Sequence, residues 1–437
     1  DSQNFEPAIN GGYRRPEGYE RYDGQMSPTV AHYSILPVTF AGVPIVAGQD
    51  VASTIITGLA TVLAVYPTYL VIFGEFSTID FPLNDVLTNV TTGGGAIGMV
   101  SGVTTVDGSS TPSDHADNLL LAANQQRTFI LAVPGSGIIR GVWNYKDDWY
   151  AFRDNLGATA GIMWKASVTG WTQVTMKFEL PFTTAIAQIF DGDTVTGNTS
   201  GATATVVVSV LRTGTWTVAG AGSLIITPLA GTFSPGEVIR VSGANKATVT
   251  AAATQITRLP GGRLEFCNFN FSGSTNTQKM YGADGVNPAF EFFAGTYVPI
   301  RTGMVADTPK HLICHKDYLF LSFLGSAQFS SLGNPYYWSV VLGAGEIACS
   351  SPIAGFLPQA GTNDGSSLAI FTEDSTAVLY GTSNLDWKLV SSIYDLGYLP
   401  YTLQQVSNNA YGMTARGIQT LVTTLNYCDF NYSSVSH

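Results

Sequence analysis

Residues 141–152 read GVWNYKDDWYAF: an apolar strand, a tight charged turn and a second apolar strand. Two further stretches repeat this order, HLICHKDYLFL at residues 311–321 and SLAIFTEDSTAVLY at residues 367–380. The first and third units continue to a strand that carries a tryptophan, Trp171 and Trp387. Hairpins of this kind, spaced by roughly 40 to 50 residues, are typical of the blades of a β-propeller. The sequence therefore predicts an all-β protein built on a propeller.

The same pattern places the expected blades along the chain. We expect antiparallel sheets, arranged radially, at residues 138–178, 262–300, 310–345, 356–391 and 402–430. Propellers commonly close by joining distant parts of the chain. A strand near residues 11–22 is therefore expected to pair with a late blade.

An internal repeat interrupts the propeller. The later copy reads DGDTVTGNTSGATATV at residues 191–206, then LIIT at 224–227 and GTFSPGEV at 231–238. The earlier copy has the same order of elements: AGQDV at 47–51, TGLATV at 57–62, YLVI at 69–72, GEFS at 74–77 and PLNDV at 82–86. Short strands separated by turn residues indicate a small all-β module in each copy. We predict that the two modules stand outside the ring of blades.

One short helix is predicted between the first module and the first blade. Asp114 can cap it, and Ala116, Leu119, Leu120 and Ala123 follow at helical spacing. We expect this helix to fill a gap on the flank of the propeller. The chain then divides into N-terminal propeller strands (1–39), the first module (40–105), the helix and first blade (106–182), the second module (183–255) and the remaining blades (256–437).

The composition indicates that the protein assembles with other subunits, and it argues against tight binding of DNA. Charged residues are only 12% of the chain, against about a quarter in a typical domain. Much of the surface is therefore expected to be covered by other subunits, although a neutral Thr- and Ser-rich monomer would have the same composition. The net charge is −11, and a protein that holds DNA needs a basic face. Sequence-specific nucleic-acid binding is not expected.

The cysteines predict neither a disulfide framework nor a metal site. Cys267, Cys314, Cys349 and Cys428 are widely spaced, without a CxxC pair. We expect free, buried thiols, consistent with folding in a reducing cytoplasm.

Residues 51–74 contain no charged residue, which nominally fits a membrane span. Pro67 and Gly58 interrupt the stretch and it matches the second module, so we predict no membrane span. No signal peptide is visible. The chain begins within a polar phrase and ends at residues 432–437, just after a strand-like run, so we expect both ends to be incomplete.

Two motifs resemble binding sites, but a turn and core packing explain them better. Residues 93–98, GGGAIG, satisfy G-x-G-x-x-G, but a strand-like run follows where a dinucleotide site needs a helix. A turn is expected instead. His311 and His315 bracket Cys314, but on a strand the two histidines share a face and the cysteine points away. Core packing is favoured over a zinc site.

No catalytic motif is complete. The chain has no G-x-S-x-G elbow, no H-E-x-x-H and no Walker loop. The acid pairs Asp147/Asp148 and Glu373/Asp374 lie in expected hairpin turns, whereas glycosidase carboxylates face each other across a cleft. We predict no catalytic, cofactor-binding or metal-binding residue, no cofactor and no enzymatic activity.

The chain holds 23 Phe, 20 Tyr and 7 Trp. Exposed aromatics would suit a glycan-binding face, whereas aromatics on propeller strands mostly pack sheet on sheet. Packing is favoured for the tryptophans in strand-like runs: Trp149, Trp164, Trp171, Trp338 and Trp387.

Four phrases resemble the propeller proteins that form the nozzle or hub of short-tailed phages, below the portal and adaptor rings. These are NFEPAINGGYRRPEGYERYDG (4–24), GIIRGVWNY with YAFR (137–145 and 150–153), KMYGADGVN (279–287), and LFLS with NPYYW and GAGEI (319–322, 334–338 and 343–347). The likeness covers residues 1–30 and about 135–434. The two inserted modules also resemble β modules that recur in phage tail proteins.

The resemblance implies a structural role in the virion tail. It implies a ring of identical copies, commonly six, in contact with portal, adaptor and other tail proteins. Double-stranded DNA would cross this ring during ejection without specific binding. A negatively charged wall repels phosphates and leaves DNA free to move, and a closed ring would also cover surface that a monomer would have to charge.

Other functions remain open. A virion-borne or secreted glycan-binding propeller would need exposed Trp or Tyr beside Asp or Asn on one loop face. A propeller glycoside hydrolase would need two facing carboxylates about 5 to 10 Å apart. A basic lumen, which would clamp DNA, could use the densest basic stretch: Arg127, Arg140, Lys146, Arg153 and Lys165.

Overall fold

The structure is a computed structural model of the 437-residue chain. It describes residues 6–7, 13–14 and 31–434, except residues 75–78, 109–110, 130, 168–169, 274–276, 360–366, 395, 407–408 and 425–428. The chain forms two compact units. The first comprises Asp1–Ala132 and Ala166–Trp171, and the second Val133–Lys165 and Thr172–His437.

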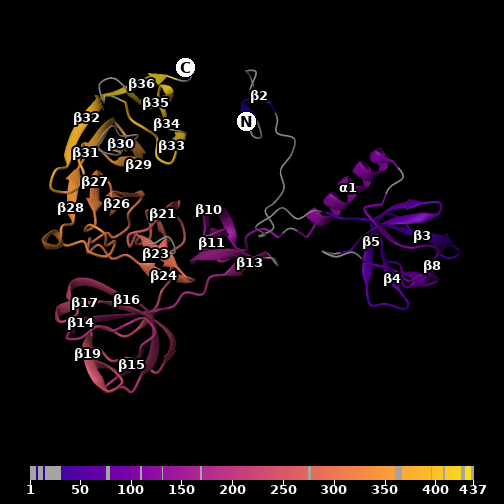
Figure 1. Ribbon diagram of the computed structural model, residues 1–437, viewed down its shortest axis with the longest axis horizontal. Helices are drawn as coiled ribbons and strands as arrows, with labels where there is room; N and C mark the ends of the chain where they lie inside the picture. The colour runs from indigo at the N-terminus through magenta and orange to yellow at the C-terminus, as the bar shows by residue number, and fades with distance from the viewer. Residues whose placement is uncertain are drawn as a thin grey trace. The chain divides into compact units, whose positions relative to one another are not determined.

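The first unit contains a closed barrel. Six strands follow the order β6-β5-β4-β7-β8-β3, and β6 pairs back onto β3 (Figure 1). The strands are β3 (Ser34–Phe40), β4 (Asp50–Ser53), β5 (Leu59–Tyr66), β6 (Tyr69–Gly74), β7 (Val86–Asn89) and β8 (Gly95–Val100), with β9 (Thr105–Val106) added beside β3. Alternate residues such as Leu36, Val62 and Leu70 fill the interior. Residues 51–74, the uncharged run, are thus barrel strands and their turns.

Helix α1 (Pro112–Arg127) packs on this barrel against β5 and β6. Its buried residue Ala122 lies in one cluster with Leu63 and Val71 of the barrel. The prediction that the helix fills a gap in the propeller was wrong, because it covers the barrel. Of the residues at helical spacing, Leu120 is 57% exposed. Among the described residues no helix is long and apolar enough to cross a membrane.

The helix cap also differs from the prediction. Thr111 is the N-cap, and its side chain accepts a hydrogen bond from the backbone N–H of Asp114. Pro112 follows at the first turn, where its missing N–H costs nothing. The Thr-Pro pair is therefore the signal that starts the helix, and Asp114 adds an acid to its first turn.

Five four-stranded antiparallel sheets form the blades. Blade 1 is β10 (Ser136–Tyr145), β11 (Asp148–Asp154), β12 (Gly161–Ser167) and β13 (Gly170–Gln173). Blade 2 is β21 (Glu265–Phe269), β22 (Lys279–Ala283), β23 (Phe290–Phe293) and β24 (Thr296–Pro299). Blade 3 is β25 (Leu312–His315), β26 (Tyr318–Phe323), β27 (Ser326–Phe329) and β28 (Gly345–Ala348), with the 3₁₀ turn η2 (Val340–Leu342) before β28.

Blade 4 is β29 (Ile353–Gln359), β30 (Ser367–Thr372), β31 (Ser375–Tyr380) and β32 (Lys388–Tyr394). Blade 5 is β33 (Gln404–Val406), β34 (Asn409–Thr414), β35 (Gly417–Thr424) and β36 (Asp429–Ser434). The five sheets occupy the ranges expected for blades, and the protein is an all-β, propeller-like fold.

Neighbouring blades pack face to face through buried aromatic side chains. The rings of Phe152 and Phe290 lie 5.7 Å apart between blades 1 and 2, and those of Phe320 and Phe356 lie 6.4 Å apart between blades 3 and 4. Buried clusters also join blade 2 to blade 3 and blade 4 to blade 5. The first strands β10, β21, β25 and β29 contact one another in turn, which makes them the inner strands of the arrangement.

A second closed barrel is inserted between blades 1 and 2. Its strands are β14 (Phe178–Ala185), β15 (Thr194–Gly197), β16 (Thr203–Thr215), β17 (Val218–Ala230), β18 (Val238–Val241) and β19 (Ala244–Val249), with β20 (Thr254–Gln255) added. The order β17-β16-β15-β18-β19-β14, closed by β17 on β14, matches the first barrel strand for strand. Both barrels begin before the expected module boundaries, at Ser34 instead of residue 40 and at Phe178 instead of residue 183.

The expected pairing of residues 11–22 with a late blade falls largely outside the described residues. Within the described part, β2 (Tyr13–Arg14) pairs with β1 (Glu6–Pro7).

Candidate functional site

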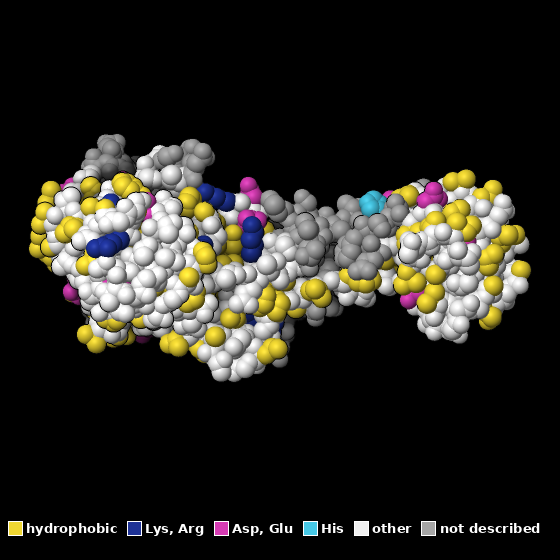
Figure 2. Space-filling view, turned by 90° about the horizontal axis from the view of Figure 1, so that it is seen from below, with side chains coloured by type: hydrophobic (Ala, Val, Ile, Leu, Met, Phe, Trp, Pro, Cys, Tyr) yellow, Lys and Arg dark blue, Asp and Glu magenta, His cyan; other side chains and the backbone are white. Residues whose placement is uncertain are grey.

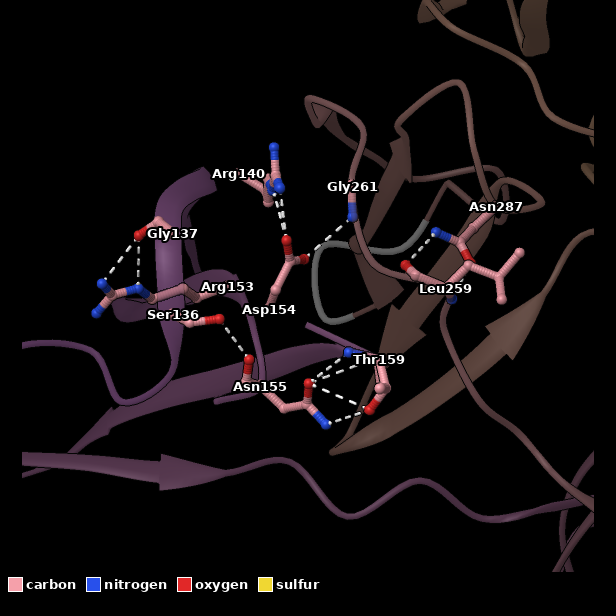
Figure 3. Close-up of polar contacts among 11 residues, drawn as sticks. Ser136, Gly137, Arg140, Arg153, Asp154, Asn155, Thr159, Leu259, Gly261 and Asn287 are labelled. Atoms are coloured by element: carbon pink, nitrogen blue, oxygen red, sulfur yellow. Dashed lines mark hydrogen bonds and ion pairs between the residues drawn. The ribbon is translucent and has the colours of Figure 1, made fainter. Parts of the chain in front are cut away.

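A group of charged side chains lies where blade 1 meets blade 2. Asp154, at the end of β11, accepts hydrogen bonds from Arg140 Nε (3.1 Å) and Nη2 (2.5 Å) and from the backbone N–H of Gly261 (3.1 Å) (Figure 3). Burial would raise the pKa of Asp154, but these hydrogen bonds outweigh it and lower the pKa below its ordinary value. Asp154 stays ionised and ties the strand to the loop that enters blade 2.

A buried cation lies beside this contact. Arg258 donates from Nη2 to Asp284 Oδ2 (2.5 Å) and from Nη1 to the hydroxyl of Tyr297 (2.8 Å). Its guanidinium also lies 5.1 Å from the ring centroid of Phe152 and 5.5 Å from that of Phe290. The side chains of Arg258 and Asp284 are 3% and 1% exposed, so water does not solvate this pair. The aromatic faces and the carboxylate supply the stabilisation instead.

A shallow hollow opens beside these groups. Its lining residues are Arg140, Phe152, Arg153, Asp154, Gly161, Ile162, Arg258, Leu259, Gly261 and Leu264. Its three arginines are already engaged: Arg140 and Arg258 with carboxylates, and Arg153 with the backbone carbonyls of Val133 and Gly137. The arrangement therefore acts as a clamp between blades and offers a ligand few free donors.

A second cluster joins the inner ends of blades 2, 3 and 5. Tyr401, just before β33, lies under Arg263 (4.7 Å from Cζ to the ring centroid) and Lys310 (5.4 Å from Nζ). The ring of His311 is 5.0 Å away. Burial raises the pKa of Tyr401 to about 12, and Glu265 adds to this shift. Side chains from three blades thus meet beside the inner strands.

The fold does not bring His311, Cys314 and His315 together as one site. His311 is fully buried with Nδ1 3.0 Å from Glu265 Oε2, and His315 is 5% exposed. Burial lowers the pKa of His315 to about 4, so this imidazole is neutral. Cys314 lies against Cys267 instead of either histidine. Among the described residues no group of three or more His, Cys, Asp or Glu could hold a metal ion.

The other motif residues lie in turns or in cores. Gly93 and Gly94 have positive φ in the turn between β7 and β8, and β8 starts at Gly95, so residues 93–98 form no phosphate loop. Asp147 lies in the β10–β11 turn with φ 65°. Asp374, in the β30–β31 turn, accepts hydrogen bonds from nearby hydroxyls, including that of Ser351.

Among the tryptophans, Trp387 packs as expected: its ring lies 4.7 Å from Tyr318 and 4.6 Å from Phe329. Trp149 is 36% exposed, so the prediction of packing is weaker there.

The basic residues that could have built a DNA clamp have partners within the blades. Arg140 pairs with Asp154, Lys165 with Asp148 (2.6 Å), and Arg153 binds backbone carbonyls. Lys146 lies over the ring of Phe293 at 4.8 Å. These four do not form a free basic stripe. Nothing is described of the side chain of Arg127.

Two buried carboxylates have structural roles that the sequence analysis did not predict. Asp85 accepts from the hydroxyls of Ser53 and Thr54, and Glu237 accepts from Ser200 N–H (2.9 Å), Ser200 Oγ (2.8 Å) and Ser234 N–H (2.6 Å). The two acids occupy the same place, since the backbone N–H of Val100 bonds the carbonyl of Asp85 and that of Val249 bonds the carbonyl of Glu237. Each acid fastens the first hairpin loop of its barrel. The repeat contained this signal, as PLND and SPGE fall at matching places.

No family model and no curated protein matches the chain. Among solved structures, one match is the crystal structure of BBS1N in complex with ARL6DN, soaked with lead. It has 9% identity and a TM-score of 0.26, and the match covers 66% of this chain and 92% of that chain. Another is the extracellular domain of the hybrid two-component system BT3049 from B. thetaiotaomicron. It has 8% identity and a TM-score of 0.28, and the match covers 92% of this chain and 63% of that chain. At these scores neither likeness bears on function.

Proposed function

We propose that this chain is a structural component of a phage tail, a nozzle or hub protein. Several copies would form a ring-shaped conduit below the portal and adaptor, through which the genome leaves the virion. The starting point is the resemblance of four phrases to such proteins. A propeller interrupted by two barrels is the architecture that this resemblance implies. We propose no catalytic role.

The observation that carries the proposal is the difference between the surfaces of the two barrels. The first barrel exposes many large apolar side chains, and Figure 2 shows one face of the molecule with hydrophobic side chains in yellow. The exposed apolar residues of this barrel are Val43, Val46, Ile55, Leu59, Val65, Tyr66, Leu83, Val86, Val90, Met99, Val103 and Val106. The described part of the second barrel exposes Ile186, Phe190 and Val218. Because both barrels have the same topology, the fold does not account for this difference, and we attribute it to a partner surface.

Matched positions make the comparison direct. Met99 pairs with Thr39 of β3 and with Val86 of β7 in the first barrel. Thr248 occupies the same register in the second barrel, pairing with β14 and with β18. Met99 is 44% exposed and Val86 39%. The first barrel thus has two exposed apolar residues, Val86 and Met99, at a cross-strand pair. In the second barrel, Thr248 takes the place of Met99 in the corresponding pair with Val238.

The first barrel also differs from the rest of the chain in its charged residues. Residues 22–126 contain no Lys or Arg and eight acidic residues, whereas the whole chain has a net charge of −11. A DNA backbone would be repelled by this segment, because no phosphate can be neutralised there. In a ring, that charge is repeated in every copy.

Contacts between blades bear on where a conduit could lie. Arg263 and Lys310 lie over the ring of Tyr401, and the ring of His311 is 5.0 Å from it, so side chains of blades 2, 3 and 5 touch one another. We therefore place the passage between copies, with the propeller as part of its wall.

Imaging of the native assembly tests the proposal. We expect a ring of more than two copies that surrounds an open channel. A native particle that holds this protein as isolated single copies would refute it. Duplex binding at low salt is the second test: the sliding conduit predicts no retention of DNA, and tight, salt-sensitive binding would replace it with a clamp.

The glycan-binding alternative gains no support from the aromatic surface. The exposed aromatic residues among those described are Tyr66, Trp149 and Phe190, at 37%, 36% and 56%. Tyr66 lies on β5, Trp149 on β11 and Phe190 in the loop before β15, so these three exposed rings of the described residues do not form one cluster on a loop face.

A further inference from the structure

Two thiols that are far apart in sequence meet between blades 2 and 3. Cys267 lies on β21 and Cys314 on β25, the inner strands of the two blades. Their sulfur atoms are 2.9 Å apart, and both residues are free and half-buried. A disulfide bond needs a separation of about 2.05 Å. The two sulfurs therefore have to approach by less than 1 Å for a bond to form.

We propose that Cys267 and Cys314 are an oxidation site that closes into a disulfide and joins blade 2 covalently to blade 3. The site does not depend on the proposed function. It requires an oxidising environment and a small-molecule disulfide such as oxidised glutathione. In a reducing cytoplasm both thiols stay reduced.

The surroundings of the two thiols assign them different parts in the exchange. Burial raises the pKa of Cys314, and the contact with Cys267 adds to this shift. The thiolate is the attacking species, so Cys314 is the poorer initial nucleophile and we assign the first attack to Cys267. The Cys267 thiolate attacks one sulfur of oxidised glutathione and expels one glutathione thiolate, which leaves a mixed disulfide.

The second step closes the site. Cys314 loses its proton to water and attacks Sγ of Cys267, which expels the second glutathione thiolate. Two protein thiols are oxidised and one glutathione disulfide is reduced to two glutathione thiols, so atoms and electrons balance. The bond would enclose the segment that holds the remaining strands of blade 2, and cross-links that close long loops stabilise folded chains.

The described part of the chain supplies a control thiol. Cys349 is also half-buried, but it packs in the cluster between blades 3 and 4, away from the Cys267–Cys314 contact between blades 2 and 3. Burial raises its pKa to about 11. Proximity, and not reactivity of thiols in general, is therefore what singles out the pair.

The test uses the full chain with Cys349→Ser and Cys428→Ser, so that the pair holds the remaining thiols. After reduction, the protein is titrated with oxidised glutathione, and a digest is analysed by mass spectrometry without reductant. We expect a cross-linked peptide that contains positions 267 and 314, loss of both alkylatable thiols, and a melting temperature a few degrees higher. All three changes should reverse with reductant.

Cys314→Ser in the same background tests the order of attack. We expect it to retain one glutathione on Cys267 and to show no rise in melting temperature. If both thiols of the parent remain alkylatable, or if the parent carries a glutathione on each cysteine without a cross-link, the proposal is overturned. The parent digest decides this even if the variant folds poorly.

Discussion

Replacing Asp284 with Asn should destabilise the interface between blades 1 and 2 far more than its single-atom change suggests. Asp284 Oδ1 accepts from the backbone N–H groups of Val286 (2.9 Å) and Asn287 (2.7 Å). Its Oδ2 accepts from Arg258 (2.5 Å) and from Asn287 Nδ2 (2.8 Å). Both oxygens thus face two donors each. Whichever oxygen is replaced by an NH₂ group, that group faces only hydrogen-bond donors and has no acceptor.

The burial of the pair sets the magnitude. Asp284→Asn would leave the guanidinium of Arg258 without a counter-charge in a site that is 3% exposed. Removing one member of a buried ion pair costs about 3–5 kcal/mol. Arg258→Met also removes one member, but it keeps much of the volume and leaves the carboxylate three N–H donors from Val286 and Asn287. Its cost should therefore lie at the lower end of this range, about 3 kcal/mol.

The assay is denaturant unfolding read by tryptophan fluorescence at neutral pH, with the midpoint and slope compared among variants. Lys165→Met is the control, because its pair with Asp148 is 43% and 32% exposed, and an exposed pair contributes about 0.2–1 kcal/mol. Two results would contradict the reasoning: Asp284→Asn within about 1 kcal/mol of the control, or Arg258→Met costing more than Asp284→Asn.

Three further predictions test other parts of the molecule. The pKa of His315 is about 4 in the folded chain against 6.5 for an ordinary histidine, so only the unfolded state takes up a proton as the pH falls between these values. Stability should therefore decrease from pH 6.5 to 4, and His315→Gln should remove that part of the slope in urea titrations. Glu237→Gln should destabilise the second barrel by about 1–3 kcal/mol at pH 7. Hydrogen bonds outweigh burial and lower the pKa of this carboxyl, so its contribution is present above the unfolded pKa and disappears as the pH falls through the lower folded pKa; the cost of the variant should therefore shrink in strong acid. Met99→Lys should abolish ring assembly seen by electron microscopy, whereas Thr248→Lys at the matching place should leave it intact; equal behaviour of the two variants would remove the first barrel from the interface.

The blades were predictable because their signal is local. Each hairpin shows its two strands and its turn within about a dozen residues, and hairpins that recur every 40 to 50 residues, roughly, are typical of propeller blades. The turn at Lys146 and Asp147 adopts positive φ at both residues, which matches the twist of the flanking strands. Local alternation, however, does not say which sheet a strand joins. The segment Ser34–Phe40 was assigned to the propeller for this reason, although it closes a barrel.

Contacts between distant segments were not predictable from one sequence. The closure of each barrel depends on the pairing of β3 with β6 and of β14 with β17, which adjacent hairpins do not specify. The approach of Cys267 to Cys314 depends on the packing of two blades, so the wide spacing of these cysteines gave no signal. The place of the helix was wrong for a similar reason. Helical spacing predicted the helix, but only the folded chain shows that Leu119 and Ala122 pack against the barrel.

The two barrels offer an internal control that few chains contain. Both copies of the fold use a buried carboxylate in the same place, Asp85 and Glu237, so this contact belongs to what the fold needs. The surfaces of the two copies differ. The first copy has no basic residue and exposes more large apolar side chains, whereas the second has three basic residues, Arg212, Arg240 and Lys246. Under the proposed function, a passage for DNA is enclosed by several copies, and each copy needs a lateral surface that is apolar without being basic. The first barrel has both properties, so the surface that would assemble the ring is also one that DNA would not bind.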